Sequence, residues 1–211
     1  MKEKIKFTFF KSLRFRIMVI LVVIGIVPSF IVKNVVVNSY ETRAVSIREV
    51  NLKNQCDILG NQLMKENYLR EPDSDVINGE LSMLSAIYNG RILIINKDAK
   101  IIKDTYDIDV GKYALSEEVI QCFEGKSTAN YDDKNAYIEM TSPITKMDSN
   151  TIEGVMLVSI STSEIEDSID MLENRGNLLL SIICILVLVF GYLLAGVLVK
   201  PFSRVTKAIE D

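Results

Sequence analysis

The chain has 211 residues, with 24 Lys and Arg against 28 Asp and Glu, no histidine, and a formal net charge of −4. The lack of histidine excludes a histidine-based metal centre and a Ser-His-Asp triad within this sequence. The acidic balance argues against nucleic acid as a partner, because phosphate binding requires a basic face.

Two uncharged apolar segments, residues 17–32 and 178–199, lie near the two ends of the chain. At ~1.5 Å rise per residue the second segment reaches roughly 33 Å, enough to cross a hydrocarbon core of ~30 Å. We therefore expect both segments to be transmembrane helices. A cleaved signal peptide is the alternative for the first segment, because a basic stretch precedes it. Val37-Asn38-Ser39 is a poor cleavage site, which favours an uncleaved anchor.

Basic residues flank both segments on the sides away from the middle of the chain. Residues 1–16 hold six Lys and Arg against Glu3 alone, and three more basic residues occur in residues 200–211. Since basic flanks favour the cytoplasm, we expect both termini inside and residues 33–177 outside a cell membrane. This outer stretch has 15 of the basic and 25 of the acidic residues, near −10, which permits cations or cationic peptides as partners. A charged, solvated surface is the plainer explanation.

A long helix is predicted to continue out of the first span, because Val35 to about Asn67 contains no proline and only one glycine. Two apolar stripes follow it with helical spacing. One stripe consists of Val45, Leu52, Cys56, Leu59 and Leu63. The other consists of Val37, Tyr40, Ala44, Ile47 and Ile58. We expect one stripe to pack on its own domain and the other on a second subunit of a homodimer.

Helical and β-type patterns then follow each other along the chain. Residues 75–88 predict a helix, and residues 91–96 and 100–106 predict a hairpin around Lys97-Asp98-Ala99. Ser116 begins a short helix that Gly125 ends, and three strands are expected at residues 127–131, 136–144 and 152–161. Ser163-x-x-Glu166 has the pattern of a capping box at the start of the last helix.

This order predicts an α+β fold. Two transmembrane helices flank an extracellular domain in which a long N-terminal helix packs on a roughly five-stranded antiparallel sheet. The short helix and the loops cover the other face, where a pocket between sheet and loops is expected. Cys56 and Cys122 lie in this domain and Cys184 in the second span, without a CxxC motif. Burial, a Cys56–Cys122 bridge and pairing of Cys56 across a dimer all remain open.

Three segments resemble the extracellular Cache (PAS-like) sensor domains of bacterial receptors. They are RILIINKDAKIIKDT, GKYALSEEVIQCFEGKST and YIEMTSPITKMDSNTIEGVMLVSIS, with Ser142-Pro143-Ile144 and Glu153-Gly154-Val155 as the most diagnostic parts. After the second span, KPFSRVTKAIED is similar to the first helix of a HAMP linker. The signal-transmitting positions would be Pro201, Phe202, Val205 and Ile209.

Together these segments resemble the N-terminal sensory region of a Gram-positive sensor histidine kinase. The resemblance implies the input module of a two-component system, with the domains 1–16 (cytoplasmic N-terminus), 17–32 (span), 33–177 (sensor), 178–199 (span) and 200–211 (start of HAMP). Without histidine the chain cannot hold the phospho-accepting histidine of a kinase. We expect no catalytic residue and no cofactor here, and contact with a response regulator only through a missing downstream kinase region. The alternatives are the input module of a chemoreceptor or cyclic-dinucleotide enzyme, and a membrane-anchored, non-catalytic protein that binds a wall component or a partner receptor.

Candidate binding residues lie near the predicted strand ends. An arginine with tyrosines can hold a carboxylate or an amphipathic solute, which makes Arg91, Tyr106, Tyr131 and Tyr137 the candidate ligand set. Packing or surface roles are the alternative for each of them. Asp104, Asp107 and Asp109 could recruit Ca²⁺, but their spacing does not fit an EF-hand loop, so no metal site is expected.

Overall fold

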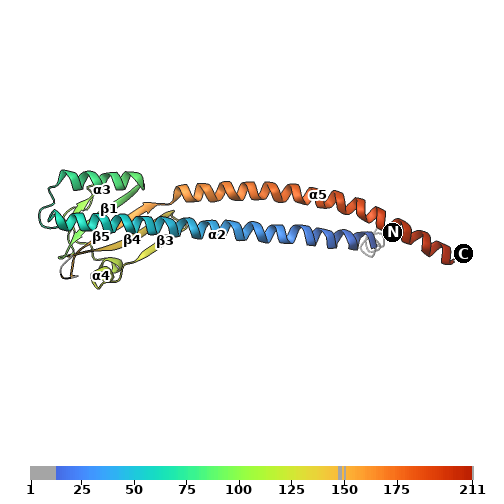
Figure 1. Cartoon of the computed structure of the whole chain (residues 1–211), viewed down its shortest axis with the longest axis horizontal. Helices are drawn as coiled ribbons and strands as arrows, with labels where there is room; N and C mark the ends of the chain where they lie inside the picture. Colours follow the sequence, from blue (N-terminus) through green and yellow to red (C-terminus); the bar gives the residue numbers. More distant parts are fainter. Residues whose placement is uncertain (1–12, 147–148, 150, 211) are drawn as a thin grey trace, which may run out of the picture. The chain divides into compact units, whose positions relative to one another are not determined.

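The computed structural model describes residues 13–146, 149 and 151–210, without the side chains at 13, 14, 17, 195, 196 and 198–210. Contacts divide the chain into two compact units. Unit 1 comprises Met1–Tyr40 and Ser168–Asp211, and unit 2 comprises Glu41–Asp167. The elements, in chain order, are α2 (Leu13–Lys65), α3 (Asp75–Ile87), β1 (Gly90–Asn96), β2 (Ile101–Asp104), α4 (Glu117–Phe123), β3 (Ala129–Asp132), β4 (Tyr137–Thr145), β5 (Ile152–Ser161) and α5 (Ser163–Glu210) (Figure 1).

The end of α2 shows why the long helix stops where the sequence analysis expects it to. Asn67 takes a left-handed backbone conformation with φ of 55°. Its N–H donates to the Met64 carbonyl at 3.2 Å, and the Tyr68 N–H donates to the Leu63 carbonyl at 2.9 Å. This pair of bonds is a Schellman motif, which satisfies the last helical carbonyls and turns the chain away. Tyr68 is then fully buried, and its hydroxyl donates to Asn78 on α3 at 2.6 Å.

Unit 2 contains one five-stranded antiparallel sheet with the strand order β2-β1-β5-β4-β3. The turn between β1 and β2 is the predicted one. The Asn96 side chain accepts hydrogen bonds from the N–H groups of Asp98 and Lys100, at 3.0 and 2.9 Å. Ala99 has a φ of 60°, which closes the turn. The prediction of an α+β fold with a five-stranded antiparallel sheet is confirmed.

One face of the sheet packs against α2 and α3 (Figure 1). The buried residues that α2 contributes are one of the two predicted stripes, Val45, Leu52, Cys56, Leu59 and Leu63. α3 adds Ile77, Leu81 and Leu84, and β1 adds Ile92 and Ile94. Each fully buried aliphatic side chain stabilises the fold by about 1.5–3 kcal/mol. We call this side of the sheet the α2 face.

The opposite side, which we call the α4 face, carries a second and smaller core. There Val119 and Cys122 of α4 meet Leu93, Ile95 and Val155 of the sheet. Cys56 belongs to the first core and Cys122 to the second, and both are free thiols. The open alternative of a Cys56–Cys122 disulfide is therefore wrong, because the sheet separates the two sulfur atoms.

Unit 1 consists of the first part of α2 and the greater part of α5. Both helices contain a segment that is long and apolar enough to cross a membrane by length and composition, and these segments are almost entirely unburied. The predicted spans 17–32 and 178–199 fall within α2 and α5, and their boundaries stay predictions. Pro201, Phe202, Val205 and Ile209 lie on the backbone of α5, but their side chains are outside the described residues.

The predicted capping box at Ser163 is one residue out of position. α5 begins with Ser163 itself, and the N–H groups of Ile165 and Glu166 donate to the carbonyl of Thr162 at 2.9 and 3.1 Å. Thr162 therefore stands in the cap position. Ser163 instead accepts a hydrogen bond from the Ser161 hydroxyl at 3.0 Å. Thr and Ser are both good N-cap residues, so their order alone does not identify the first helical residue.

Candidate functional site

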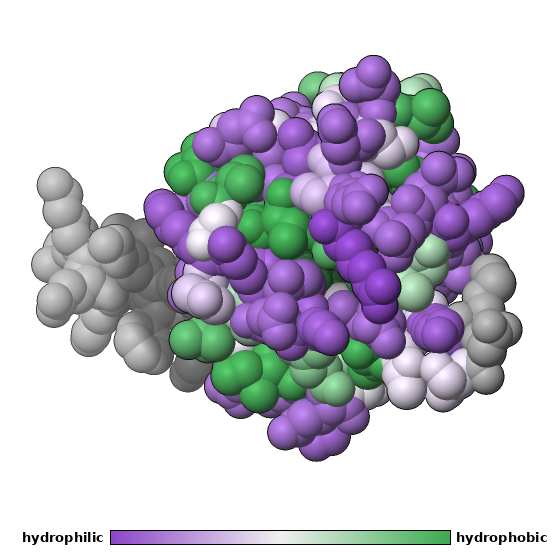
Figure 2. Space-filling view, turned by 90° about the vertical axis from the view of Figure 1, so that its left-hand side faces the viewer, coloured by the Kyte–Doolittle hydropathy of each residue, from purple (hydrophilic) through white to green (hydrophobic). Residues whose placement is uncertain are grey.

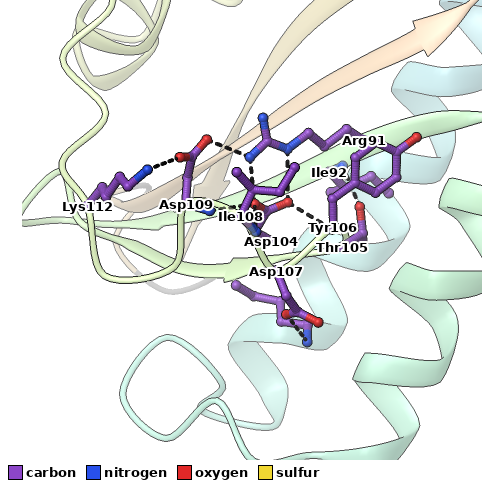
Figure 3. A network of polar contacts seen from close by, with 10 residues as sticks. Arg91, Ile92, Asp104, Thr105, Tyr106, Asp107, Ile108, Asp109 and Lys112 are labelled. Carbon is purple, nitrogen blue, oxygen red and sulfur yellow. Dashed lines mark hydrogen bonds and ion pairs between the residues drawn. The ribbon is translucent and has the colours of Figure 1, made fainter.

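A network around Arg91 joins the first strands of the sheet to the loop that follows them (Figure 3). Arg91 is the second residue of β1, and Asp104 is the last residue of β2. The guanidinium donates from Nε to Asp104 Oδ1 at 3.0 Å and from Nη2 to Asp104 Oδ2 at 2.6 Å. Nη2 also donates to Asp109 Oδ2 at 2.6 Å, and Lys112 Nζ donates to the other oxygen of Asp109 at 2.5 Å.

The carboxylate of Asp104 also organises the loop at residues 105–109. Its Oδ1 accepts from the Tyr106 N–H, and its Oδ2 accepts from the N–H groups of Ile108 and Asp109, all at 2.9 Å. Asp107 takes a left-handed backbone conformation with a φ of 55°, which reverses the direction of the chain in this loop. A short polar side chain that binds the backbone after it is typical of such turns. The loop is thus built on one buried carboxylate.

The pKa values of this network follow from its geometry. Burial by itself would raise the pKa of Asp104, but the hydrogen bonds from Arg91 and the three backbone amides outweigh it and lower the pKa well below 3.8. The pKa of Asp109 is lowered mainly by Lys112 and then by Arg91. The hydrogen bonds that Arg91 donates to Asp104 raise the pKa of Arg91. All of these groups are charged at neutral pH.

The part of the α4 face that α4 itself does not cover is polar. Arg91, Ser159, Glu139 and Asn130 are opposite one another on four neighbouring strands, so their side chains form one row across this face. Tyr137, Ser161 and Asp132 form the next row. Ser159 donates its hydroxyl to Glu139 Oε2 at 3.2 Å. We call these two rows the polar rows.

The four residues predicted to hold a ligand do not form a single site. Arg91 and Tyr137 lie in adjacent polar rows, two strands apart. Tyr106 lies in the loop after β2, with half of its surface exposed. Tyr131 lies on the α2 face, where its hydroxyl donates to Glu41 Oε1 on α2 at 3.4 Å. Ligand binding by any of them stays a prediction.

The polar rows also contain residues that the sequence analysis did not select, above all Glu139 and Ser159. The alternation of β4 carries the signal that could have identified them. Ile138 and Met140 are buried in the first core, so Glu139 and Tyr137 must share the other face. The alternation of residues along β4 and β5 is thus enough to group Glu139, Tyr137 and Ser159 from the sequence.

The three aspartates considered for Ca²⁺ have other partners. Asp104 and Asp109 bind Arg91, and Asp107 pairs with Lys103 at 3.5 Å. Within residues 13–146, 149 and 151–210, no group of three or more His, Cys, Asp or Glu is placed to hold a metal ion. The carboxylate oxygens of these three residues instead bind the Arg91 guanidinium, the ammonium groups of Lys103 and Lys112, and backbone amides.

A separate hollow of about 540 Å³ lies where the end of α2 meets the β1–β2 turn. Its lining includes Arg70, Lys97 and Lys146, with Asp98 and Glu153 beside them. The face of the molecule seen in Figure 2 is mostly hydrophilic, with apolar side chains in separate small patches. Three basic and two acidic residues mix in this hollow, so it is not lined by charges of one sign.

No family model and no curated protein matches the sequence. Among solved structures, the sensor domain of the V. cholerae histidine kinase DctB is 14% identical, with 64% of this chain and 59% of that chain covered and a TM-score of 0.42. The ligand-binding domain of the Campylobacter jejuni chemoreceptor Tlp3, in complex with L-valine, is 14% identical, with 63% and 60% covered and a TM-score of 0.42. A domain of a sensory box/GGDEF family protein from Vibrio parahaemolyticus is 12% identical, with 59% and 57% covered and a TM-score of 0.37. The chain spans about three fifths of the length of these structures.

Proposed function

We propose that unit 2 is an extracellular sensor domain of the Cache (PAS-like) type, and that the chain is the input module of a membrane receptor. One observation carries this proposal. α2 and α5, the first and last helices to contribute to unit 2, each also contain an apolar segment that can cross a membrane. A small shift of packed helices is a known form of switching. Binding on unit 2 can therefore act on the same helices that enter the bilayer.

The output of the receptor is part of the proposal. The resemblance of the sensor segments together with residues 200–211 favours a two-component sensor histidine kinase of the Gram-positive type. Phosphorylation and contact with a response regulator would then belong to a region downstream of Asp211. A chemoreceptor and a cyclic-dinucleotide enzyme are the alternatives, because both use the same kind of input module.

The ligand would bind over the polar rows. Two aspartates already neutralise Arg91, so the remaining charges in these rows are the carboxylates of Glu139 and Asp132. Tyr137 lies between them and offers both a ring face and a hydroxyl. This arrangement suits a ligand with an amine or another cation, as in a cationic peptide or wall component. A membrane-anchored binding protein without an output is the second candidate, favoured by the acidic charge of residues 33–177.

The receptor would be a homodimer. The second predicted stripe of α2 leaves Tyr40, Ile47 and Ile58 exposed, with Val50 beside them, while Val37 is buried and Ala44 is half-buried. Large aliphatic side chains in a line on a helix are typical of a helix–helix interface. Two copies anchored in one bilayer share an orientation, which favours parallel pairing along this line.

Thiol labelling of intact cells tests the proposed orientation. A cysteine is introduced at the exposed Ser82 of α3 in one variant and at Lys6 in another. Burial, and then the charge of Asp57, raise the pKa of Cys56 to about 12, and burial raises that of Cys122, so these two native thiols of unit 2 react slowly. Cys184 is replaced by serine in both variants. A membrane-impermeant maleimide should label Ser82→Cys in intact cells, and Lys6→Cys only after permeabilisation. The reverse pattern would show that unit 2 faces the cytoplasm.

A further inference from the structure

Unit 1 contains a groove of about 580 Å³ between α2 and α5. Residues 28–37 of α2 form one wall and residues 172–183 of α5 form the other. The part of the groove nearer the middle of the proposed spans is apolar and includes Val32, Leu179 and Ile183. This part falls within the proposed spans, where an acyl chain is the natural contact for an apolar surface.

Two cationic side chains, Lys33 and Arg175, line the same groove at the outer ends of the proposed spans. The stem of Lys33 crosses α5 at Gly176, where an added Cβ would lie 2.9 Å from the Lys33 Cγ. Its Nζ donates to Asn177 Oδ1 at 2.7 Å. Gly176 therefore provides the space that brings Lys33 to the neighbourhood of Arg175, and a larger residue there would push it away.

These cations are unusual in their position. Lys and Arg that flank membrane spans are biased toward the cytoplasmic side, whereas Lys33 and Arg175 lie next to the outer ends of the proposed spans. In the part of the chain that the structure describes, neither side chain has an ion pair with a carboxylate. An ammonium offers three donors and a guanidinium five, so both side chains can donate to an anion in addition to the bond from Lys33 to Asn177.

We infer that this groove binds one anionic phospholipid of the outer leaflet, with its phosphate between Lys33 and Arg175 and an acyl chain along Val32, Leu179 and Ile183. The inference rests on the proposed membrane insertion of α2 and α5. From Arg175 to Ile183 the helix descends roughly 12 Å, close to the ~15 Å depth of one leaflet. The groove thus combines a site for a headgroup phosphate with a wall of matching length for the chain below it.

A second copy of the chain is the competing occupant. A symmetric contact uses the same patch on both subunits, so a copy in this groove would bring its own Lys33 and Arg175 to the same place. Four cations would then lie close together, and like charges at short distance repel one another. An anionic lipid removes this repulsion, which is why the charges favour it as the occupant.

The test uses the full chain in nanodiscs of equal parts phosphatidylcholine and phosphatidylglycerol, followed by native mass spectrometry of the lipids that stay bound. The wild-type chain should retain phosphatidylglycerol over phosphatidylcholine on the order of tenfold. The double variant Lys33→Gln/Arg175→Gln should lose this preference. Val32→Trp, which fills the groove and keeps both cations, should lose it as well. The matched control Arg43→Gln/Lys53→Gln removes the same charge from exposed positions of α2 in unit 2 and should keep it.

Equal retention of both lipids by the wild-type chain would overturn the inference, and so would an equal loss of preference in the control. A photo-crosslinker at Leu179 provides a second measurement that does not depend on the variants. Its attachment to lipid supports the inference, and its attachment to a second chain overturns it. Resistance of the chain to carbonate extraction from membranes separates the two failures. A chain that stays in the membrane but shows no lipid preference contradicts this inference and leaves the proposed spans intact.

Discussion

Arg91 and Asp104 form a two-point ion pair between the start of β1 and the end of β2, with Nε–Oδ1 and Nη2–Oδ2 distances of 3.0 and 2.6 Å. The Asp104 side chain is completely buried, and that of Arg91 is 27% exposed. The same carboxylate binds three backbone amides of the following loop. The pair therefore fixes the edge of the sheet, the loop and the end of one polar row at the same time.

Removal of the charge of Asp104 should destabilise the fold strongly. Asp104→Asn leaves the Arg91 guanidinium without its main partner, and breaking a buried ion pair from one side costs about 3–5 kcal/mol. Urea unfolding of the full chain in detergent, followed by circular dichroism, measures the change. The neighbouring pair Lys103–Asp107 provides the control, because Asp107 is 74% exposed. Asp107→Asn should cost at most ~1 kcal/mol, and equal losses for the two variants would contradict this account.

The same carboxylate predicts how stability depends on pH. The folded pKa of Asp104 lies below its unfolded value of 3.8, so the folded state binds fewer protons than the unfolded state in this range. Its stabilising contribution is complete above that pH and is lost as the pH falls toward the folded pKa. The free energy of unfolding should therefore decrease below about pH 4 more steeply in the wild-type chain than in Asp104→Asn. Parallel curves for the two proteins would show that Asp104 is not responsible.

Two glycines should respond to alanine in opposite directions. A Cβ at Gly154, in β5, would lie 2.6 Å from the Ile95 carbonyl oxygen, whereas a Cβ at Gly79, in α3, meets no atom within 4 Å. Gly154→Ala should cost about 1–3 kcal/mol, because the strand must shift to relieve the overlap. Gly79→Ala should stabilise by up to ~1 kcal/mol through helix propensity. Thermal unfolding of both variants measures this contrast, and an unchanged midpoint for Gly154→Ala would contradict the packing of β5 against β1.

The exposed stripe of α2 predicts an effect on association that is separate from stability. Ile47→Glu should weaken the proposed homodimer roughly tenfold or more, because it removes about 1.5–3 kcal/mol of apolar burial per subunit. Ser46→Glu, at an exposed neighbouring position on another side of the helix, should have little effect. Analytical ultracentrifugation of the full chain in detergent compares the two variants at equal helix content. The same affinity in both would exclude this stripe as the interface.

The order of helices and strands could be predicted from the sequence because most boundaries have local causes. Asn67 ends α2, Asn96 closes the β1–β2 turn, and Ser74 caps α3 by accepting a hydrogen bond from the Ile77 N–H. Each of these signals involves residues within a few positions of one another. The exception is the start of α5, where Thr162 and Ser163 are adjacent residues of types that both serve as caps, and only the hydrogen bonds to the Thr162 carbonyl distinguish them.

The candidate site could be predicted only in part, because it depends on strand register. The sequence analysis assigned Arg91 to a ligand and Asp104 to a cation, yet the two residues are halves of one ion pair. Their contact requires β1 and β2 to pair with Leu93 opposite Asp104, across a bulge next to Ile95. The sequence analysis also grouped Tyr131 with Tyr137, because the sequence alone does not give the register of their strands. The two tyrosines occupy opposite faces of the sheet, since a shift of one residue along a strand reverses the face on which a side chain lies.

The central claim is that events on unit 2 change the activity of whatever follows the second proposed span. The most direct test joins residues 1–211 to the cytoplasmic kinase region of a two-component receptor and measures histidine phosphorylation in membrane vesicles. Glu139→Gln and Tyr137→Phe alter the polar rows without touching α2, and Lys126→Gln is the exposed control outside them. The account predicts that the two polar-row variants change phosphorylation while the control matches the wild-type chain, at equal membrane insertion. Identical phosphorylation in all four proteins, with or without cationic wall peptides, would contradict a sensory role for this face.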